Sequence, residues 1–349
     1  MDYIIEKNDC SNLDELITLS KSYYSTGDII DKSYLSWQYL NNPAGAPFLF
    51  TSKEKSTGNL AGQYLVLPME YQIEGKIVAG SLSLNTLTHP DHQRKGLFTK
   101  MANAAYTDCA ENDNYFTTGF PNPMSYPGFV KKLDFVHLGD IPLLIKPLKP
   151  LSILFSYFQK DKEKHGGEIE FKHKTTKNNI KEFDFNDKQD QNKYDSFWNK
   201  IKMNYPISSN KDFQFLKWRY NDHPTKKYKI FYSHKNDEIA GIIVLRAEHV
   251  WGFKVGTIMD LMQLDLADKT VLKFASKSYR QMNLDFIAAL HSDIGEYKTL
   301  KKCNFFKIPQ KLLPQNIHFI VRNNKEFDND DKILKSENWK LTFGDYDVF

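Results

Sequence analysis

Residues 87–100, LTHPDHQRKGLFTK, describe a strand end, a tight turn and the beginning of a helix. An alternation of apolar residues stops before Pro90, and apolar residues then recur at helical spacing beyond Gly96. Gly96 has no Cβ, so a ligand can approach the backbone at the start of that helix. Free N–H groups and the helix dipole favour an anion there, and Arg94 and Lys95 add positive charge. This geometry suits a pyrophosphate, although structural capping alone explains one glycine and two basic residues at a helix start equally well.

The segments around this turn predict a mixed α/β sheet. Apolar runs between turn signals predict strands at 47–53, 61–75, 76–88, 115–120 and 135–147. Helical spacing and capping residues predict helices at 11–24, 35–42, 93–112 and 125–135. Strands followed by helix–strand–helix–strand are typical of an α/β fold with a mixed sheet.

One block occurs twice, as YLSWQYLNNP at 34–43 and as FLKWRYNDHP at 215–224. A tryptophan, Trp37 or Trp218, stands six residues before the proline in each copy. Two further matches follow in the same order, 60–68 with 239–246 and 131–135 with 301–305. An internal duplication is the most economical explanation. The repeated tryptophans are more typical of core anchors than of ligand contacts.

The duplication predicts two mixed-sheet domains, at 1–150 and 196–349. Residues 151–195 are polar and rich in lysine and asparagine, and we expect a linker there.

Composition excludes several classes of protein. The mean hydropathy is −0.55 and no run of 18 apolar residues occurs, so we expect no membrane span. The N-terminus has no basic region before an apolar core, and the three cysteines lie far apart, which favours a reducing cytoplasm. The 47 basic and 43 acidic residues leave a net charge of +4, which is too weak to indicate a nucleic-acid partner.

The 87–100 turn resembles motif A of the GCN5-related N-acetyltransferase (GNAT) superfamily, Gln-x-x-Gly-x-Gly/Ala, here Gln93-x-x-Gly96-x-Phe98. Phe98 departs from the usual small residue. The resemblance implies a tandem GNAT fold, with loop amides that hold the pyrophosphate of acyl-CoA and a strand backbone that binds pantetheine. The residues expected to contact acyl-CoA are Leu87, Thr88, Gln93, Arg94, Lys95, Gly96, Leu97, Phe98, Thr99, Asn122 and Phe129.

Residues 117–135 resemble motif B of the same superfamily, a strand and a short helix that ends in a Leu-Gly-Phe-like triplet. The tyrosine that protonates the thiolate in many members would align with Val130. Tyr126, one helical turn earlier, and its neighbour Ser125 are the candidate proton donors. Asn122 is the candidate for hydrogen bonding to the pantetheine or acyl carbonyl.

The second copy lacks this turn, since residues 264–274 carry neither a glycine nor a basic pair. We therefore expect it to help bind the acceptor and not CoA. The residues expected to bind the acceptor are Arg219, Tyr220, His223, Asp260, His291 and Asp293. Asp260, His291 and Asp293 are also candidates for the base, and the carboxylate of Asp260, inside a strand-like run, needs a partner if it is buried.

His89 and His92 lie three residues apart in a proline turn, but no further ligands follow at a recognisable spacing. We expect no metal ion.

The resemblance implies N-acyl transfer from acetyl-CoA or a longer donor such as hydroxybutyryl-CoA. The Trp-x-Tyr blocks and residues 120–125 are also similar to bacterial N-acyltransferases that modify dTDP-linked amino-dideoxyhexoses for surface polysaccharides, lipopolysaccharide O-antigen among them. A drug or protein amine is a rival acceptor. A tRNA-dependent aminoacyl transferase, against which the Gln93–Gly96 loop argues, and a non-catalytic CoA-binding protein remain alternatives, and a homodimer is left open.

Overall fold

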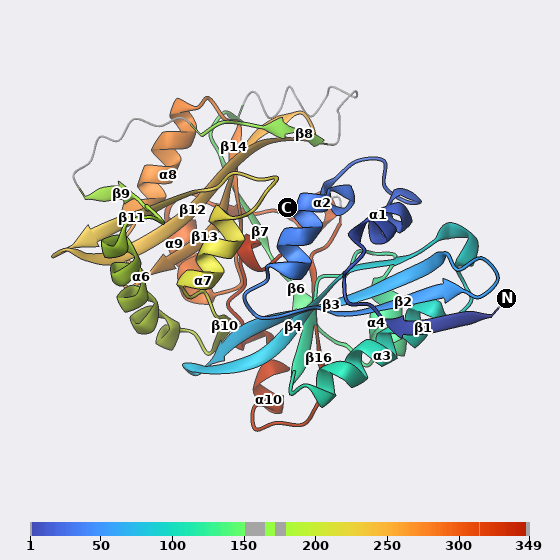
Figure 1. Cartoon of the computed structure of the whole chain (residues 1–349). Helices are drawn as coiled ribbons and strands as arrows, with labels where there is room; N and C mark the ends of the chain where they lie inside the picture. The colour runs from blue at the N-terminus through green and yellow to red at the C-terminus, as the bar shows by residue number, and fades with distance from the viewer. Residues whose placement is uncertain (1, 151–164, 172–178, 314, 347–349) are drawn as a thin grey trace. The chain divides into compact units, whose positions relative to one another are not determined.

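The computed structural model describes residues 2–150, 165–171, 179–313 and 315–346. The chain forms two compact units (Figure 1). The first unit contains Met1–Asp140, Asp222–Thr225 and Gln315–Asn338. The second contains Ile141–Asn221, Lys226–Pro314 and Trp339–Phe349. Each unit is built on its own mixed β-sheet.

The sheet of the first unit has one parallel pair of strands in an otherwise antiparallel order. Its strands, in spatial order, are β1 (Tyr3–Lys7), β2 (Phe48–Glu54), β3 (Leu60–Ile73), β4 (Lys76–Thr88), β5 (Phe116–Gly119), β16 (His318–Asn323) and β6 (Val136–Asp140). The parallel pair is β4 with β5. A helical crossover joins these two strands, as parallel neighbours require.

The helices of the first unit are α1 (Leu13–Lys21), α2 (Lys32–Leu35), α3 (Leu97–Glu111), α4 (Tyr126–Lys132) and α10 (Asp330–Ile333). A π-helical turn, Ser36–Leu40, continues α2, and Trp37 within it is buried. Apolar residues of α3 and α4, such as Met101 and Phe129, share one core cluster with Tyr64 of β3 and Ile320 of β16. These two helices therefore cover the same face of the sheet.

The sheet of the second unit repeats the first. Its strands, in spatial order, are β9 (Ile180–Glu182), β11 (Lys229–Lys235), β12 (Glu238–Val250), β13 (Phe253–Gln263), β14 (Phe286–Leu290), β7 (Leu143–Pro147) and β15 (Phe306–Lys307). β8 (His165–Glu168) pairs with β12, and the short strand β10 (Ile207–Ser209) lies outside this sheet. β13 and β14 form the parallel pair here.

The helices of this unit are α6 (Lys188–Ile201), α7 (Phe213–Leu216), α8 (Thr270–Gln281) and α9 (Ile294–Lys302). The π-helical turn Lys217–Asn221 holds the buried Trp218. Both repeated tryptophans are thus core residues. The predicted α/β class with two duplicated mixed sheets is confirmed.

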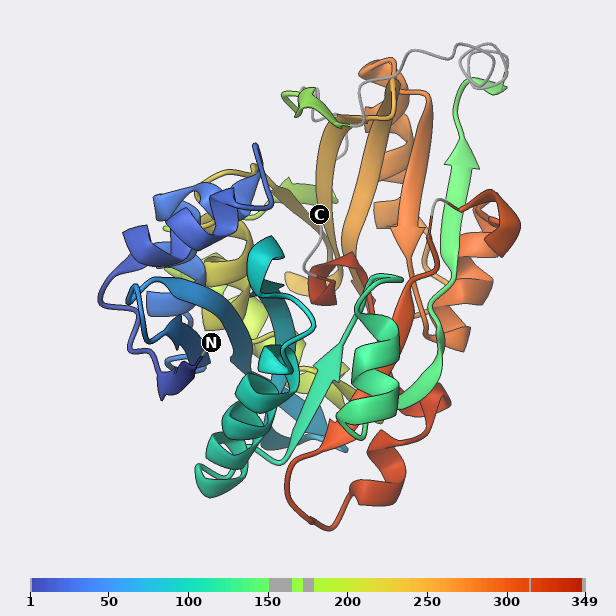
Figure 2. The same cartoon turned by 90° about the vertical axis from the view of Figure 1, so that its right-hand side faces the viewer.

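The two sheets exchange one strand each. The apolar run predicted as a single strand at 135–147 is two strands, since β6 ends at Asp140 and β7 begins at Leu143. β6 pairs in the first sheet, whereas β7 lies between β14 and β15 in the second (Figure 2). In return, β16 fills the equivalent place between β5 and β6. The predicted domain boundary at residue 150 therefore does not separate the two sheets, because β7 precedes it but pairs in the second sheet and β16 follows it but pairs in the first.

The range predicted as a linker, 151–195, is only partly described by the structure. Within it lie β8, β9 and the first turns of α6, which belong to the second unit.

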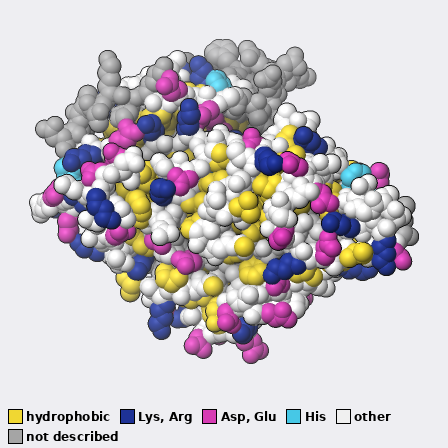
Figure 3. Space-filling model, in the orientation of Figure 1, with side chains coloured by type: hydrophobic (Ala, Val, Ile, Leu, Met, Phe, Trp, Pro, Cys, Tyr) yellow, Lys and Arg dark blue, Asp and Glu magenta, His cyan; other side chains and the backbone are white. Residues whose placement is uncertain are grey.

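Acidic and basic side chains are interspersed over the face of the molecule in Figure 3, in agreement with a net charge of +4. Among the described residues, no helix has the length and apolar character that crossing a membrane requires.

Candidate functional site

The first unit has an open strand edge where β4 and β5 part. The two strands pair from Gly80–Phe116 to Ser83–Gly119, and there β5 ends. β4 continues to Thr88, hydrogen-bonded to β3 on its other side. Within the described part of the chain, residues 84–88 have no strand partner on the β5 side. An extended ligand with amide groups can pair with this backbone edge.

A bulge shapes this edge. Leu65 lies opposite Leu84 and Gln63 lies opposite Leu87, so β4 carries one extra residue between these pairs. Asn85 within the bulge has a φ of 50°. Bulges re-aim backbone and side-chain groups next to functional sites.

The N-terminus of α3 follows directly after the open edge. Gly96 precedes the helix with φ 75° and ψ 7°, and no side chain caps it. Lys100 is the first residue whose N–H bonds to a carbonyl of this turn, Gly96 O at 3.2 Å. The N–H groups of Leu97, Phe98 and Thr99 therefore lie before the first backbone hydrogen bond of the helix. A Cβ built on Gly96 meets no atom within 4 Å, so the space in front of these amides is open.

Positive charge surrounds this helix start. A shallow hollow of about 550 Å³ is lined by Asp2, Tyr3, Lys55, Lys95 and Lys100. Gln93 and Arg94 are also exposed in this turn, and Arg94 is left-handed with a φ of 61°. The predicted anion-binding residues thus lie together around one helix terminus, which suits a phosphate group.

The ring of Phe98 lies away from the open space at Gly96. It packs at 5.5 Å from the ring of Tyr64 and 5.6 Å from that of Phe129, both in the core cluster. A Cβ on Gly128 of α4 would lie 3.1 Å from the Phe98 ring. Gly128 therefore provides the room that a bulky residue at this motif position requires.

Asn122 and Ser125 build the start of α4. The Oδ1 of Asn122 accepts hydrogen bonds from the N–H groups of Met124 at 3.0 Å and Ser125 at 2.9 Å. The Ser125 hydroxyl donates to the backbone carbonyl of Asn122 at 3.3 Å. This turn uses the side-chain oxygen of Asn122, whereas a hydrogen bond to an acyl carbonyl requires its amide N–H group, and the roles of both residues remain predictions.

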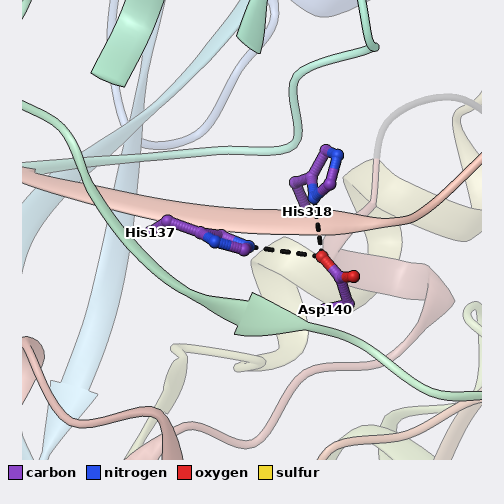
Figure 4. Close-up of side chains that lie close together, drawn as sticks. All are labelled: His137, Asp140 and His318. Carbon is purple, nitrogen blue, oxygen red and sulfur yellow. Dashed lines mark hydrogen bonds and ion pairs between the residues drawn. The ribbon is translucent and has the colours of Figure 1, made fainter. Parts of the chain in front are cut away.

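Tyr126 lies at the first turn of α4 among residues that the sequence did not single out. Its ring packs against His318 at 4.4 Å and, edge-on, against His137 at 5.3 Å. Asp140 joins the two histidines (Figure 4). Nothing in the local sequence connects these side chains, because His318 arrives on the exchanged strand β16.

The corresponding edge in the second unit is occupied by the chain itself. β13 pairs with β14 only as far as Ile258–Ala289 and then continues to Gln263. Lys340 donates from Nζ to the carbonyl oxygen of Leu261 at 2.8 Å, and Thr342 forms a β-bridge with His291. Residues 339–346 therefore take the place that is open beside β4.

Buried charges hold this C-terminal segment. The ammonium of Lys211 binds Asp260 and, at 3.1 Å, Asp345, while Tyr220 and Thr342 donate to Asp260. Burial lowers the pKa of Lys211, but the two carboxylates outweigh it and raise that pKa above its ordinary value. The buried Asp260 thus has the partners that its position requires.

A second buried cluster surrounds Glu296. Its carboxylate lies against Lys340 and His291 and accepts a hydrogen bond from Tyr205 at 2.7 Å. Burial raises the pKa of Glu296, but Lys340 and His291 outweigh this effect and bring the pKa to about 2. Burial and the neighbouring carboxylate raise the pKa of Tyr205 well above its ordinary value.

The six residues predicted to bind the acceptor all have partners within the chain. Tyr220 and Asp260 bind each other, and Arg219 donates to Gly344 O at 3.2 Å. Asp293 caps α9 by accepting from Glu296 N at 2.7 Å. His223 packs on Trp37 in the first unit, at 4.2 Å between ring centroids.

His89 and His92 also have local partners. His92 Nδ1 pairs with the Tyr3 hydroxyl at 2.9 Å, and His89 Nδ1 accepts from Asp91 N at 3.3 Å.

Comparisons with known proteins concern the fold. The family model of the acetyltransferase (GNAT) domain matches residues 48–137, from β2 to the start of β6. No curated protein matches the chain.

Solved structures resemble the whole chain. A GCN5-related N-acetyltransferase from Anabaena variabilis has a TM-score of 0.63 at 12% identity and covers 93% of this chain and 73% of its own. N-myristoyltransferase of Saccharomyces cerevisiae with bound myristoyl-CoA has a TM-score of 0.61 at 12% identity, covering 97% and 89%. A probable N-acyltransferase of unknown function from Enterococcus faecalis has a TM-score of 0.59 at 11% identity, covering 93% and 73%. These likenesses identify a GNAT fold.

Proposed function

We propose that the chain is an acyl-CoA-dependent N-acyltransferase that modifies the amine of a nucleotide-linked amino sugar. The observation that carries the acyl-CoA part is the open edge of β4, which leads directly to the uncapped N-terminus of α3 and its lysines. The pantetheine arm of acyl-CoA can pair with a strand edge, and the pyrophosphate at its end can bind at a helix N-terminus. The GNAT domain match to 48–137 supports the same assignment.

The proposed reaction is direct acyl transfer. The pantetheine arm pairs with residues 84–88 of β4, and a backbone N–H near Leu87 and Thr88 stabilises the oxyanion of the tetrahedral intermediate. The neutral acceptor amine attacks the thioester carbonyl, the C–N bond forms and the C–S bond breaks. The amine loses a proton to solvent or a base, and the CoA thiolate gains one from the hydroxyl of Tyr126.

The acceptor class rests on sequence resemblance. Both Trp-x-Tyr blocks and residues 120–125 are similar to those of the nucleotide-sugar N-acyltransferases. The donor is acetyl-CoA or hydroxybutyryl-CoA under this proposal.

Calorimetric titration with acetyl-CoA tests the donor site. We expect the wild type to bind and Gly96→Glu to lose binding, because a residue with a Cβ is strained at a φ of 75° and the new carboxylate repels the pyrophosphate. Gly75→Glu is the matched control, since Gly75 also has a positive φ of 82° but lies at the opposite end of β4. A folded wild type that does not bind, or equal loss in both variants, would refute the acyl-CoA site.

Thiol release tests the acceptor. We expect turnover with a dTDP-linked amino-dideoxyhexose, and not with an aminoglycoside or a lysine peptide. Turnover with either of these instead would favour the drug or protein-amine alternative. Acetyl-CoA binding without turnover on any amine would favour a non-catalytic CoA-binding protein, and binding of aminoacyl-tRNA in place of acetyl-CoA would favour an aminoacyl transferase.

A further inference from the structure

We propose that His137, Asp140 and His318 form a binding site for a divalent transition-metal ion such as Zn²⁺ in the first unit. This site goes beyond the acyl-transfer proposal and does not depend on it. It also departs from the expectation of no metal, which rested on His89 and His92 alone.

The exchanged strand creates the site. His318, the first residue of β16, is the register partner of Asp140, the last residue of β6, although 178 positions separate them in the chain. His137 lies on the same strand as Asp140. Two imidazoles and one carboxylate thus come from two adjacent strands.

A bulge in β6 directs the two β6 ligands to one side. In a regular strand, His137 and Asp140 would point to opposite faces because their separation is odd. Here Ile320 lies opposite His137 and His318 opposite Asp140, so four residues of β6 face three of β16. Gly139 within the bulge has a φ of 139°, which favours glycine. The local backbone is therefore shaped to bring these two side chains together.

The three ligand atoms converge on one point. Asp140 Oδ1 lies 2.6 Å from His318 Nδ1 and 3.2 Å from His137 Nε2, and Figure 4 shows the two rings on different sides of the carboxylate. One ligand atom from each of the three residues lies within 4.8 Å of the others. Zinc bonds of ~2.1 Å in tetrahedral geometry place ligand atoms about 3.4 Å apart. To admit the ion, the 2.6 Å pair would widen by about 0.8 Å and the pair of ligand atoms farthest apart would close by about 1.4 Å at most.

The second histidine distinguishes a metal site from a simple acid–base pair. A carboxylate that orients one imidazole for proton transfer needs one histidine, whereas here both rings aim a nitrogen at the same oxygen. In the metal-free state these nitrogens donate hydrogen bonds to Asp140. Two imidazoles with a carboxylate favour Zn²⁺, Co²⁺ or Ni²⁺ over Mg²⁺ or Ca²⁺, which prefer all-oxygen ligands.

The surroundings suit an ion with an open coordination position. The side chains of His137, Asp140 and His318 are 31%, 17% and 18% exposed, so an ion can enter and a water or ligand can complete its shell. The ring of Tyr126 packs on both imidazoles and limits their rotation. The carboxylate supplies the negative charge that a half-buried cation requires.

Metal titration of the chelator-treated full chain, without CoA, tests the site. We expect one Co²⁺ per chain, with the visible absorption of a tetrahedral complex, and displacement by Zn²⁺. His318→Ala and Asp140→Asn should each weaken binding roughly 100-fold, since the first removes a direct ligand and the second removes the charge of another. Zn²⁺ should raise the melting temperature of the wild type but not of these variants.

The double variant His89→Ala/His92→Ala is the matched control, because it removes the other pair of neighbouring histidines of the same unit. It should bind the metal as the wild type does. Circular dichroism of each metal-free variant checks its fold, and Asp140→Asn preserves the side-chain volume if His318→Ala does not fold. The proposal fails if the folded wild type binds no stoichiometric ion, or if binding is lost in the control and kept in His318→Ala or Asp140→Asn.

Discussion

The hydroxyl of Tyr220 donates a hydrogen bond to Asp260, and in the first unit Tyr39 receives one from Asn85 at 3.1 Å. The two tyrosines occupy the same position of the repeated Trp-x-Tyr block. Asn85 and Asp260 both lie at irregularities of the long strands β4 and β13. The tyrosine of each block therefore links a π-helical turn to the long strand, β4 or β13, that continues beyond its parallel neighbour. The repeated block thus has a structural role in each unit.

Removing these hydroxyls should destabilise the two units unequally. Tyr39→Phe loses a bond from a neutral amide and should cost about 1 kcal/mol, whereas Tyr220→Phe loses a bond to a buried carboxylate and should cost about 2–3 kcal/mol. Denaturant unfolding of both variants measures the difference. A larger cost for Tyr39→Phe would contradict the assignment of the charged acceptor to Asp260.

The Glu296 cluster should make stability depend on pH. The folded pKa of Glu296, about 2, lies below its ordinary value of 4.5, so the unfolded chain binds a proton more readily. The stabilisation is full above pH 4.5, decreases as the pH falls towards 2, and amounts to roughly 3 kcal/mol.

Unfolding free energies of the wild type and Glu296→Gln between pH 2.5 and 6 measure this dependence. The wild type should lose more stability on acidification than the variant. Glu111→Gln, at an exposed helix end, is the control and should follow the wild type. Parallel curves for wild type and Glu296→Gln would show that the Glu296 cluster does not cause the pH dependence of stability.

Substitutions at Gly128 and Phe98 should be energetically coupled. Phe98→Ala removes a half-buried ring and should cost about 2 kcal/mol, below the ~3–5 kcal/mol of a fully buried phenylalanine. Gly128→Ala places its Cβ 3.1 Å from that ring and should be better tolerated in the Phe98→Ala background. A double-mutant cycle measures the coupling, and strict additivity would contradict the contact.

The lysines at the start of α3 should bind the phosphates of acyl-CoA. Lys95→Gln/Lys100→Gln should weaken acetyl-CoA binding about tenfold at low salt, with a smaller effect at high salt because these charges are exposed. S-acetylpantetheine, which lacks the phosphates, should bind both proteins equally. Lys76→Gln, at the far end of β4, serves as the control, and an equal loss for both ligands would argue against phosphate contacts.

Several features of the fold could be predicted from local sequence. The strand–turn–helix at 87–111 follows from apolar spacing, Pro90 and Gly96, since periodicity and backbone freedom act over a few residues. The duplication is visible because Trp37 and Trp218 fill equivalent core positions. The roles proposed for Asn122 and Tyr126 follow from motif alignment and remain predictions.

By itself, the sequence determined most helices and strands between residues 47 and 135, that the unit occurs twice, and that Gly96 precedes a helix start. Only the tertiary structure decided which strands become neighbours. The exchange of β7 and β16 brings His318 to Asp140, and the bridge from Thr342 to His291 places the C-terminal segment beside β13. Such pairings depend on backbone hydrogen bonds and burial between residues far apart in the chain, which local periodicity does not encode.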